Sequence, residues 1–227
     1  MPIAESTNGA PELQTCSDGV AGGVIDRRRG AAPNPGPVSR TSLALTRWTG
    51  LAAVFVLWST QGLGSARAHF DLLGERPLSY LAHRPAAGEL FSGGLVVAAV
   101  LFVCFHGYVR TRYPVGTLFS VAMLVAMAGQ FVAGVVPIGG TGVAGRLHVT
   151  SALVLGALIP VLMWRFAACQ PLGPWRRRCY GLFWLEGVAC VAGVALSQRH
   201  VAPLAEILPA MGFHAWVVAV TLHHVRT

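Results

Sequence analysis

Long runs of apolar residues, separated by short polar stretches, fill most of the chain after residue 42. Six of these runs come close to the roughly 20 residues that a helix needs to cross a bilayer, although the first and the fifth are marginal in length. Because the connections between the runs are short, we predict an all-α fold: a transmembrane bundle of six helices with no separate soluble domain. The predicted helices cover residues 43–63, 89–109, 115–136, 147–166, 179–196 and 204–222.

The first 42 residues have a different character from the rest of the chain. They are polar and rich in glycine and proline, they include the proline-rich stretch 33–37, and they show no helical or strand periodicity. A segment of this composition buries too little apolar surface to fold on its own. We therefore predict a disordered leader over residues 1–42 and a transmembrane domain over residues 43–227.

Composition excludes an ordinary soluble protein. The chain is 54% hydrophobic and only 11% charged, whereas soluble domains carry about 25% charged residues. Its net charge of +8 comes entirely from arginine, because the sequence contains no lysine. A basic protein can bind nucleic acid, but these arginines lie in short clusters between apolar runs, without a basic groove or interleaved aromatic residues. We therefore expect no nucleic acid partner and read the arginines as a topology signal.

The arginines divide unequally between the two sides of the predicted bundle. Five lie in loops on one side, at Arg67, Arg76, Arg84, Arg146 and Arg199. Cytoplasmic loops of membrane proteins carry an excess of arginine and lysine, so we predict that both termini are cytoplasmic and that the protein is a multi-pass protein of the inner or plasma membrane. The other twelve, all on the predicted cytoplasmic side, are Arg27, Arg28, Arg29, Arg40, Arg47, Arg110, Arg112, Arg165, Arg176, Arg177, Arg178 and Arg226.

The cysteines show no pattern typical of a metal site or a disulfide framework. No pair has the C-x-x-C spacing, and none lies in a loop that we place outside. We therefore expect each one to act as small apolar filler in the bundle. The five cysteines are Cys16, Cys104, Cys169, Cys179 and Cys190.

A glycine-rich hairpin over residues 135–148 joins the third and fourth predicted helices and places His148 at the start of the fourth. Ser151 lies one turn further along the same helix, and Gln130 lies at a similar depth on the third helix. A histidine at a helix end is often only a satisfied hydrogen-bonding group. These two polar neighbours favour the interpretation that His148 lines a site on the outer face.

Three acids lie near the same outer face. Asp71 and Glu75 are four residues apart in the long loop over residues 65–88, so on a helical turn they share a face. Glu206 lies in the first turn of the sixth predicted helix, where the helix dipole also favours an acid for purely structural reasons. A solvated loop explains Asp71 and Glu75 equally well. As a functional hypothesis, we expect Asp71, Glu75, His148 and Glu206 to be the catalytic residues.

Glu186 lies near the middle of the fifth predicted helix, and an ionisable group at that depth is a functional candidate. With Cys190, Gly193 and Ser197 it forms a stripe of small and polar residues at helical spacing, which must face protein or water. A simple helix-packing face is the equally weighted alternative. The residues that we expect to line a substrate site are Phe70, Tyr80, Gln130, Phe131, Ser151, Glu186, Phe213, His214 and Trp216.

Several of these features resemble a known family: the segment Asp71-Leu72-Leu73-Gly74, the hairpin around Pro137, His148 at the start of a helix, and Glu206 at the sixth helix. Over about residues 45–224 the chain is similar to the domain-of-unknown-function 998 family of small six-helix membrane proteins. The resemblance implies a fold but no reaction. The apolar bundle with outer acids is also similar, in architecture alone, to small bacterial membrane-bound terpene cyclases, and such a likeness does not establish function.

The leading functional hypothesis is a membrane-embedded acid/base enzyme acting on an apolar isoprenoid or lipid-like substrate. A carboxyl in an apolar cavity is a good general acid, so Asp71, Glu75 or Glu206 would protonate an alkene or epoxide and start cyclisation of a prenylated, terpenoid substrate. His148 or a second carboxylate would take a proton back. We expect no metal and no cofactor for this reaction. The expected partners are membrane lipid, the apolar substrate and a prenyltransferase of the same pathway.

Two other classes of function remain open. A haem-binding or electron-transfer bundle needs two histidines at matching depth on facing helices, and His106 with His223, or His148 with His200, are the pairs that the sequence offers. A transporter or a non-catalytic assembly partner is the second class. Pro160 and Pro209 within predicted helices give it modest support, although the sequence shows no inverted repeat.

Overall fold

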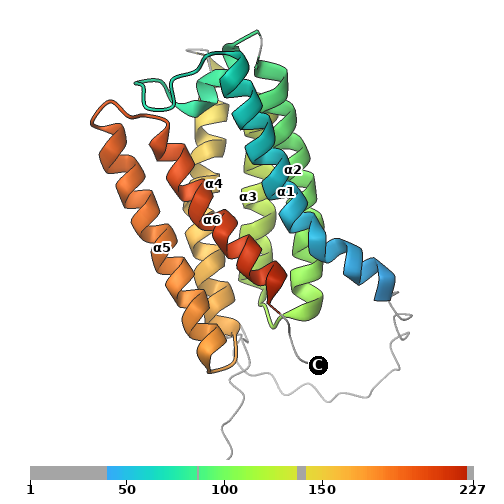
Figure 1. The fold of residues 1–227 in the computed structure, drawn as a ribbon. Helices are drawn as coiled ribbons and strands as arrows, with labels where there is room; N and C mark the ends of the chain where they lie inside the picture. Colours follow the sequence, from blue (N-terminus) through green and yellow to red (C-terminus); the bar gives the residue numbers. More distant parts are fainter. Residues whose placement is uncertain (1–39, 86, 137–141, 224–227) are drawn as a thin grey trace, which may run out of the picture.

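The structure, a computed structural model, describes residues 40–85, 87–136 and 142–223, so most of the predicted leader lies outside the described residues. Within the described part the fold is all-α, as predicted, with six long α-helices, one short 3-10 helix and no strand (Figure 1). The helices are α1 (Arg40–Arg67), η1 (Leu78–His83), α2 (Gly88–Arg112), α3 (Thr117–Val135), α4 (Val143–Cys169), α5 (Pro174–Ser197) and α6 (Leu204–Leu222).

Five of these helices, α2 to α6, are long and apolar enough to cross a membrane, so the chain is a multi-pass membrane protein. The helix α1 coincides with the first predicted span but is not among these five. The predicted ends are right to within about three residues except at one end and two starts. The helix α1 ends at Arg67 rather than near residue 63. The helix α4 begins at Val143 rather than near residue 147, and α5 begins at Pro174 rather than near residue 179.

The early start of α5 has a local cause. Gly173 adopts a φ of 151°, a backbone conformation that a residue with a side chain rarely adopts, and it ends the short turn after α4. Pro174 then occupies the first turn of α5, where its missing N–H costs nothing and its fixed φ suits a helix. The three arginines that follow therefore lie on the helix rather than in a loop.

Consecutive helices pack against each other as antiparallel neighbours. The most extensive contacts are α1 with α2, α3 with α4 and α5 with α6, and α2 with α3 joins the first two pairs. The helix α6 lies between α5 and α1, whereas α5 lies at the edge of the bundle (Figure 1). Large apolar side chains along α5, such as Trp184, Val188 and Val191, are exposed, as expected for a helix that faces lipid.

Aromatic side chains form the core of the bundle in the half that contains the α2–α3 and α4–α5 turns. Trp216 of α6 is fully buried, with its ring centroid 5.2 Å from that of Phe166 and 5.7 Å from that of Phe213. Tyr113, in the α2–α3 turn, donates a hydrogen bond of 2.8 Å to the carbonyl of Val220. Burial raises the pKa of the Tyr113 phenol, so the group stays protonated and ties the turn to the end of α6.

Three glycines allow helices to approach each other closely. A side chain at Gly129 of α3 would meet the carbonyl oxygen of Ser151 on α4 at 2.9 Å, and one at Gly193 of α5 would meet the carbonyl of Leu204 at 2.8 Å. Gly212 of α6 lies against the carboxyl of Glu186 in the same way. Membrane helices associate through such small residues because lipid provides no hydrophobic drive between them.

Among the described cysteines, the predicted packing role fits Cys179, which is buried, whereas Cys104 is exposed. Cys16 lies outside the described residues. Cys104, Cys179 and Cys190 are free thiols. Cys169, however, is disulfide-bonded, so the expectation of a purely packing role is wrong for this residue. It is the last residue of α4 and is half-buried.

The close contact at Gly129 leads to a prediction on stability. Gly129→Ala should lower the free energy of unfolding by roughly 1–3 kcal/mol, because the new methyl group meets a backbone atom that cannot rotate away. Gly156→Ala on α4 is the matched control, since a methyl group there meets nothing within 4 Å. Unfolding of both variants in mixed micelles measures the difference. Equal stability of the two variants would contradict the close packing of α3 on α4.

Candidate functional site

Buried polar side chains gather at the end of the bundle that carries η1. They come from η1 and from three long helices, and each is almost fully removed from solvent. Burying a polar group costs free energy unless it finds a hydrogen-bond partner, so a cluster of this kind needs an explanation beyond packing. The members are Gln61 and Ser65 on α1, Ser79 on η1, Gln130 on α3, and His148 and Ser151 on α4.

The carboxyl group of Glu206 is held in place by η1. Glu206 is half-buried in the first turn of α6. Its two oxygens accept a hydrogen bond of 2.9 Å from the backbone N–H of Ser79 and one of 2.8 Å from the Ser79 hydroxyl. Both oxygens therefore act as acceptors in this arrangement, and the same residue of η1 provides both donors.

The long loop over residues 65–88 contains η1, and the sequence of η1 explains how it packs. Leu78 and Leu81 are three residues apart, which places them on one side of a 3-10 helix. They form a small apolar cluster with Phe91 at the start of α2, and Ile207 of α6 packs against it. The helix η1 therefore covers the starts of α2 and α6 while Ser79 binds Glu206.

The imidazole of His148 is oriented by a backbone carbonyl. Its Nδ1 lies 2.7 Å from the carbonyl oxygen of Val136 at the end of α3, and the ring is almost completely buried. A carbonyl can only accept, so Nδ1 carries the proton in this contact and Nε2 is the ring nitrogen left for a second partner. His148, at the start of α4, and Glu206, at the start of α6, both lie at the η1 end of the bundle.

Gln130 lies on α3, and Ser151 lies on α4, the helix that carries His148. The Gln130 side-chain amide donates a hydrogen bond of 3.0 Å to the carbonyl of Leu95 on α2. The backbone of Ser151, one turn after His148, is the group that contacts Gly129. The structure therefore brings together Gln130, His148 and Ser151, the neighbours that the sequence analysis placed at one depth.

The other two predicted acids lie at the surface. Asp71 is exposed and accepts a hydrogen bond of 2.9 Å from the backbone N–H of Leu73. Glu75 forms an ion pair of 3.1 Å with His200, and their side chains are 75% and 79% exposed. Their loop is tied to the α5–α6 turn, because the N–H of Ala202 donates to the carbonyl of Gly74 at 3.1 Å. Neither carboxyl joins the buried cluster, and their catalytic role stays a prediction.

The predicted aromatic lining is divided among three places. Phe70 packs on the η1 cluster, and the half-buried ring of Tyr80 lies 4.8 Å from the guanidinium of Arg76. Phe131 is 42% exposed on the outer surface of α3. Phe213 and Trp216 belong to the aromatic core. Only Phe70 and Tyr80 therefore lie beside the polar cluster.

His214 marks the inner limit of the polar region. Its Nδ1 accepts a hydrogen bond of 2.9 Å from the indole N–H of Trp58 on α1. The Phe102 ring stacks on the imidazole at a centroid distance of 5.9 Å. This contact couples α1 to α6, and below it the interior becomes aromatic.

Glu186 forms a separate site between α5 and α6. It is 0% exposed, and one carboxyl oxygen accepts a contact of 3.5 Å from the Cys190 thiol. The other oxygen has no hydrogen-bond partner among the described residues. Gly193, which packs on the start of α6, is two helical turns nearer the η1 end, so Glu186 lies roughly 10 Å deeper than that contact. The hydrogen bond of Glu186 to Cys190 stays within α5, and the hydrogen bonds of Glu206 are to η1.

Sequence reasoning missed four polar members of this region: Trp58, Gln61, Ser65 and Ser79. A signal for the first three was present, because they are spaced by three and four residues and so share one face of a helix. Ser79 carried no such signal. It lies in a loop-like stretch, and only the packing of η1 brings it to Glu206.

The histidine pairs that would hold a haem have other neighbours. His106 stacks on Phe119 at a centroid distance of 6.0 Å, and His223 stacks on Trp175 at 3.7 Å. His148 is buried, whereas His200 is exposed. Among the described residues no group of three or more His, Cys, Asp or Glu side chains is arranged to hold a metal ion.

Comparison with known proteins yields one match. The model of a family described as "Protein of unknown function (DUF998)" matches residues 50–223, the greater part of the chain, and confirms the resemblance found from the sequence. No curated protein and no solved structure matches the chain. The weaker architectural likeness to terpene cyclases gains no support from these comparisons.

The double hydrogen bond at Glu206 leads to a prediction on local motion. Glu206→Ala removes both acceptors for Ser79, so the amide groups of η1 should exchange with deuterium about tenfold faster or more. Hydrogen–deuterium exchange with mass spectrometry measures this directly. Glu75→Ala removes an exposed pairing in the same region and should leave η1 unchanged. Equal exchange of η1 in the wild type and Glu206→Ala would show that Glu206 does not hold it.

Proposed function

We propose that this chain, which belongs to the DUF998 family of proteins of unknown function, is an acid/base enzyme embedded in the membrane. Its proton-transfer pair would be Glu206 and His148. One observation carries the proposal. A carboxyl group and an imidazole both lie at the η1 end of a membrane bundle, and each is oriented by a fixed hydrogen bond. Such pairs in apolar surroundings are typical of general acid/base sites.

The hydrogen bonds indicate which group donates a proton to the substrate and which group accepts one. Both oxygens of Glu206 accept from Ser79, so the carboxylate is set to take up a proton. Nδ1 of His148 is committed to Val136, so Nε2 can carry the proton that the site gives away. We therefore assign the donor role to His148 and the acceptor role to Glu206. These roles are the reverse of those expected from the sequence, where the acid was the proton donor.

The substrate that fits this arrangement is apolar with one polarisable group, such as the epoxide of a prenylated small molecule. It would enter from the bilayer, since the walls of the site are membrane-spanning helices. In the narrowest form of the proposal, Nε2–H of His148 protonates the epoxide oxygen, the C–O bond breaks, and an alkene of the same molecule attacks the carbon to close a ring. Glu206 then removes a proton from carbon, and the product is an isomer of the substrate. A prenyltransferase would supply such a substrate.

Turnover by purified variants tests this proposal. Wild-type protein in lipid nanodiscs, given a panel of prenylated epoxides and alkenes, should form products of unchanged mass and altered retention. Glu206→Gln and His148→Gln should each lower the rate by about 100-fold or more, because general acid and base groups contribute roughly that factor. Asp71→Asn and Glu75→Gln are matched controls at the surface and should keep full activity. Formation of the product by a Glu206→Gln, His148→Gln double variant at the wild-type rate would rule out the pair.

We also infer that α1 is a sixth span and that both termini are cytoplasmic. The 28 residues of α1 extend about 42 Å, which exceeds the roughly 30 Å hydrocarbon core. Its polar residues Gln61 and Ser65 are buried in the bundle, so they do not oppose insertion. The excess of arginine at the end that carries Arg110 and Arg176 favours the cytoplasm for that end.

Reporter fusions distinguish six spans from five. With six spans the two termini share a compartment, and with five they lie on opposite sides. A fluorescent protein that folds only in the cytoplasm should report signal when fused to either terminus, and alkaline phosphatase inserted after Arg84 should be active. Signal from one terminus alone would mean that α1 does not cross the membrane.

A further inference from the structure

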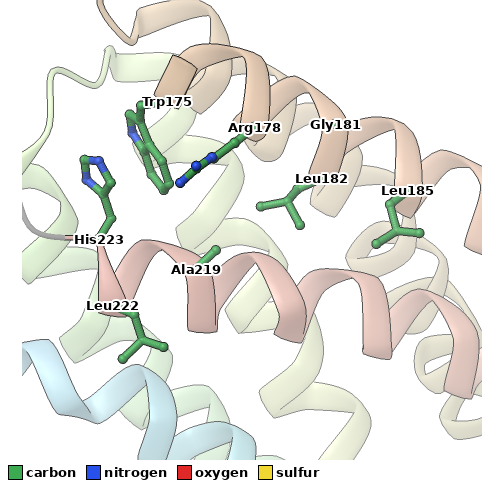
Figure 2. A pocket seen from close by; sticks show the side chains of 8 residues that line it. All are labelled: Trp175, Arg178, Gly181, Leu182, Leu185, Ala219, Leu222 and His223. Atoms are coloured by element: carbon green, nitrogen blue, oxygen red, sulfur yellow. The ribbon is translucent and has the colours of Figure 1, made fainter. Parts of the chain in front are cut away.

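A groove of about 690 Å³ opens between α5 and α6 at the end of the bundle opposite η1. Its apolar wall is formed by Leu182 and Leu185 of α5 and by Ala219 and Leu222 of α6 (Figure 2). Gly181 adds no side chain, and a methyl group built there meets nothing within 4 Å. The groove is therefore an open apolar channel along two membrane-spanning helices.

Polar and aromatic side chains surround one end of this groove. The ring planes of Trp175 and His223 stack with their centroids 3.7 Å apart. The exposed Arg178 side chain extends toward Trp175, between it and Leu182 (Figure 2). Aromatic rings and arginines at helix ends are typical of the headgroup level of a bilayer. The groove thus runs from headgroup level toward the apolar interior.

Charge is segregated between the two ends of the bundle. Arg176, Arg177 and Arg178 occupy the first turns of α5 beside the groove. The acids that the structure describes lie elsewhere, with Glu186 deeper in the bundle and the others at the η1 end; these are Asp71, Glu75, Glu89 and Glu206. Among the described residues, no carboxylate at this end is thus available to neutralise Arg178. An anion is the complementary ligand.

We infer that this groove binds one anionic phospholipid, with its phosphate on Arg178 and one acyl chain along Leu182 and Leu185. An arginine presents a planar pair of donors that matches a phosphate, and basic pockets between membrane helices recognise anionic headgroups. The apolar channel below Arg178 takes an acyl chain, which a free phosphate lacks. The site lies at the opposite end of the bundle from Glu206 and His148 and is independent of the function proposed for them.

Two pairs of matched variants separate this site from general attraction to an anionic membrane. Arg178→Gln removes the charge that lines the groove, whereas Arg177→Gln removes the same charge from the next residue, which does not line it. Gly181→Leu fills the channel and leaves Arg178 in place. Gly187→Leu adds the same side chain to α5 outside the groove, at a position that is equally open.

Native mass spectrometry of the full chain in mild detergent, with equal amounts of phosphatidylglycerol and phosphatidylcholine, measures the binding. The wild type should retain one phosphatidylglycerol in preference to phosphatidylcholine. Arg178→Gln should weaken phosphatidylglycerol binding about tenfold, and Gly181→Leu should weaken it comparably although the charge is unchanged. Arg177→Gln and Gly187→Leu should bind within about twofold of the wild type. Circular dichroism verifies that each variant keeps its helices.

Three results would overturn the inference. Equal loss in Arg177→Gln and Arg178→Gln would mean diffuse attraction to the arginine-rich end. Unchanged binding in Gly181→Leu would mean that no acyl chain occupies the groove. Equal retention of the two lipids by the wild type would mean that the site does not select an anionic headgroup.

Discussion

A polar group that a helix carries into the bilayer must find its partner inside the protein, because lipid offers none. This constraint organises the η1 end of the bundle. Glu206 accepts from Ser79, His148 donates to the carbonyl of Val136, and Gln130 donates to the carbonyl of Leu95. Each bond joins two different elements, so satisfying the side chains also ties η1 to α6, α4 to the end of α3, and α3 to α2.

The opposite half of the bundle is held by a different interaction. There the interior is filled by aromatic rings around Trp216, and the polar contacts move to the rim, where Tyr113 binds the end of α6. The two ends therefore face different ligands. One acid and an imidazole lie beneath η1, whereas arginines and exposed apolar side chains surround the groove between α5 and α6. A substrate at one end and a bound lipid at the other would occupy separate surfaces of one small fold.

Sequence reasoning reached the helices and part of the site. Apolar runs place the five confirmed spans because each run is long enough to cross a bilayer, and the family resemblance is confirmed over residues 50–223. The grouping of Gln130, His148 and Ser151 was also predictable, since few residues of the sequence separate the end of α3 from the start of α4. The sequence did not predict that Phe213 and Trp216 lie in the core, away from the polar cluster. Hydrophobicity alone does not distinguish a core residue from a residue that lines a site.

By itself the sequence determined that the chain is all-α, that it enters a membrane, and where its positive charge lies. These properties follow from local composition and length. Only the tertiary structure decided that Glu206 is held by η1 while Asp71 and Glu75 are solvated, because all three are carboxyl side chains on the same side of the predicted bundle. The difference arises from η1, whose packing against α2 and α6 brings Ser79 to Glu206 across 127 positions of the chain. A contact between residues so far apart in sequence has no local pattern from which to predict it.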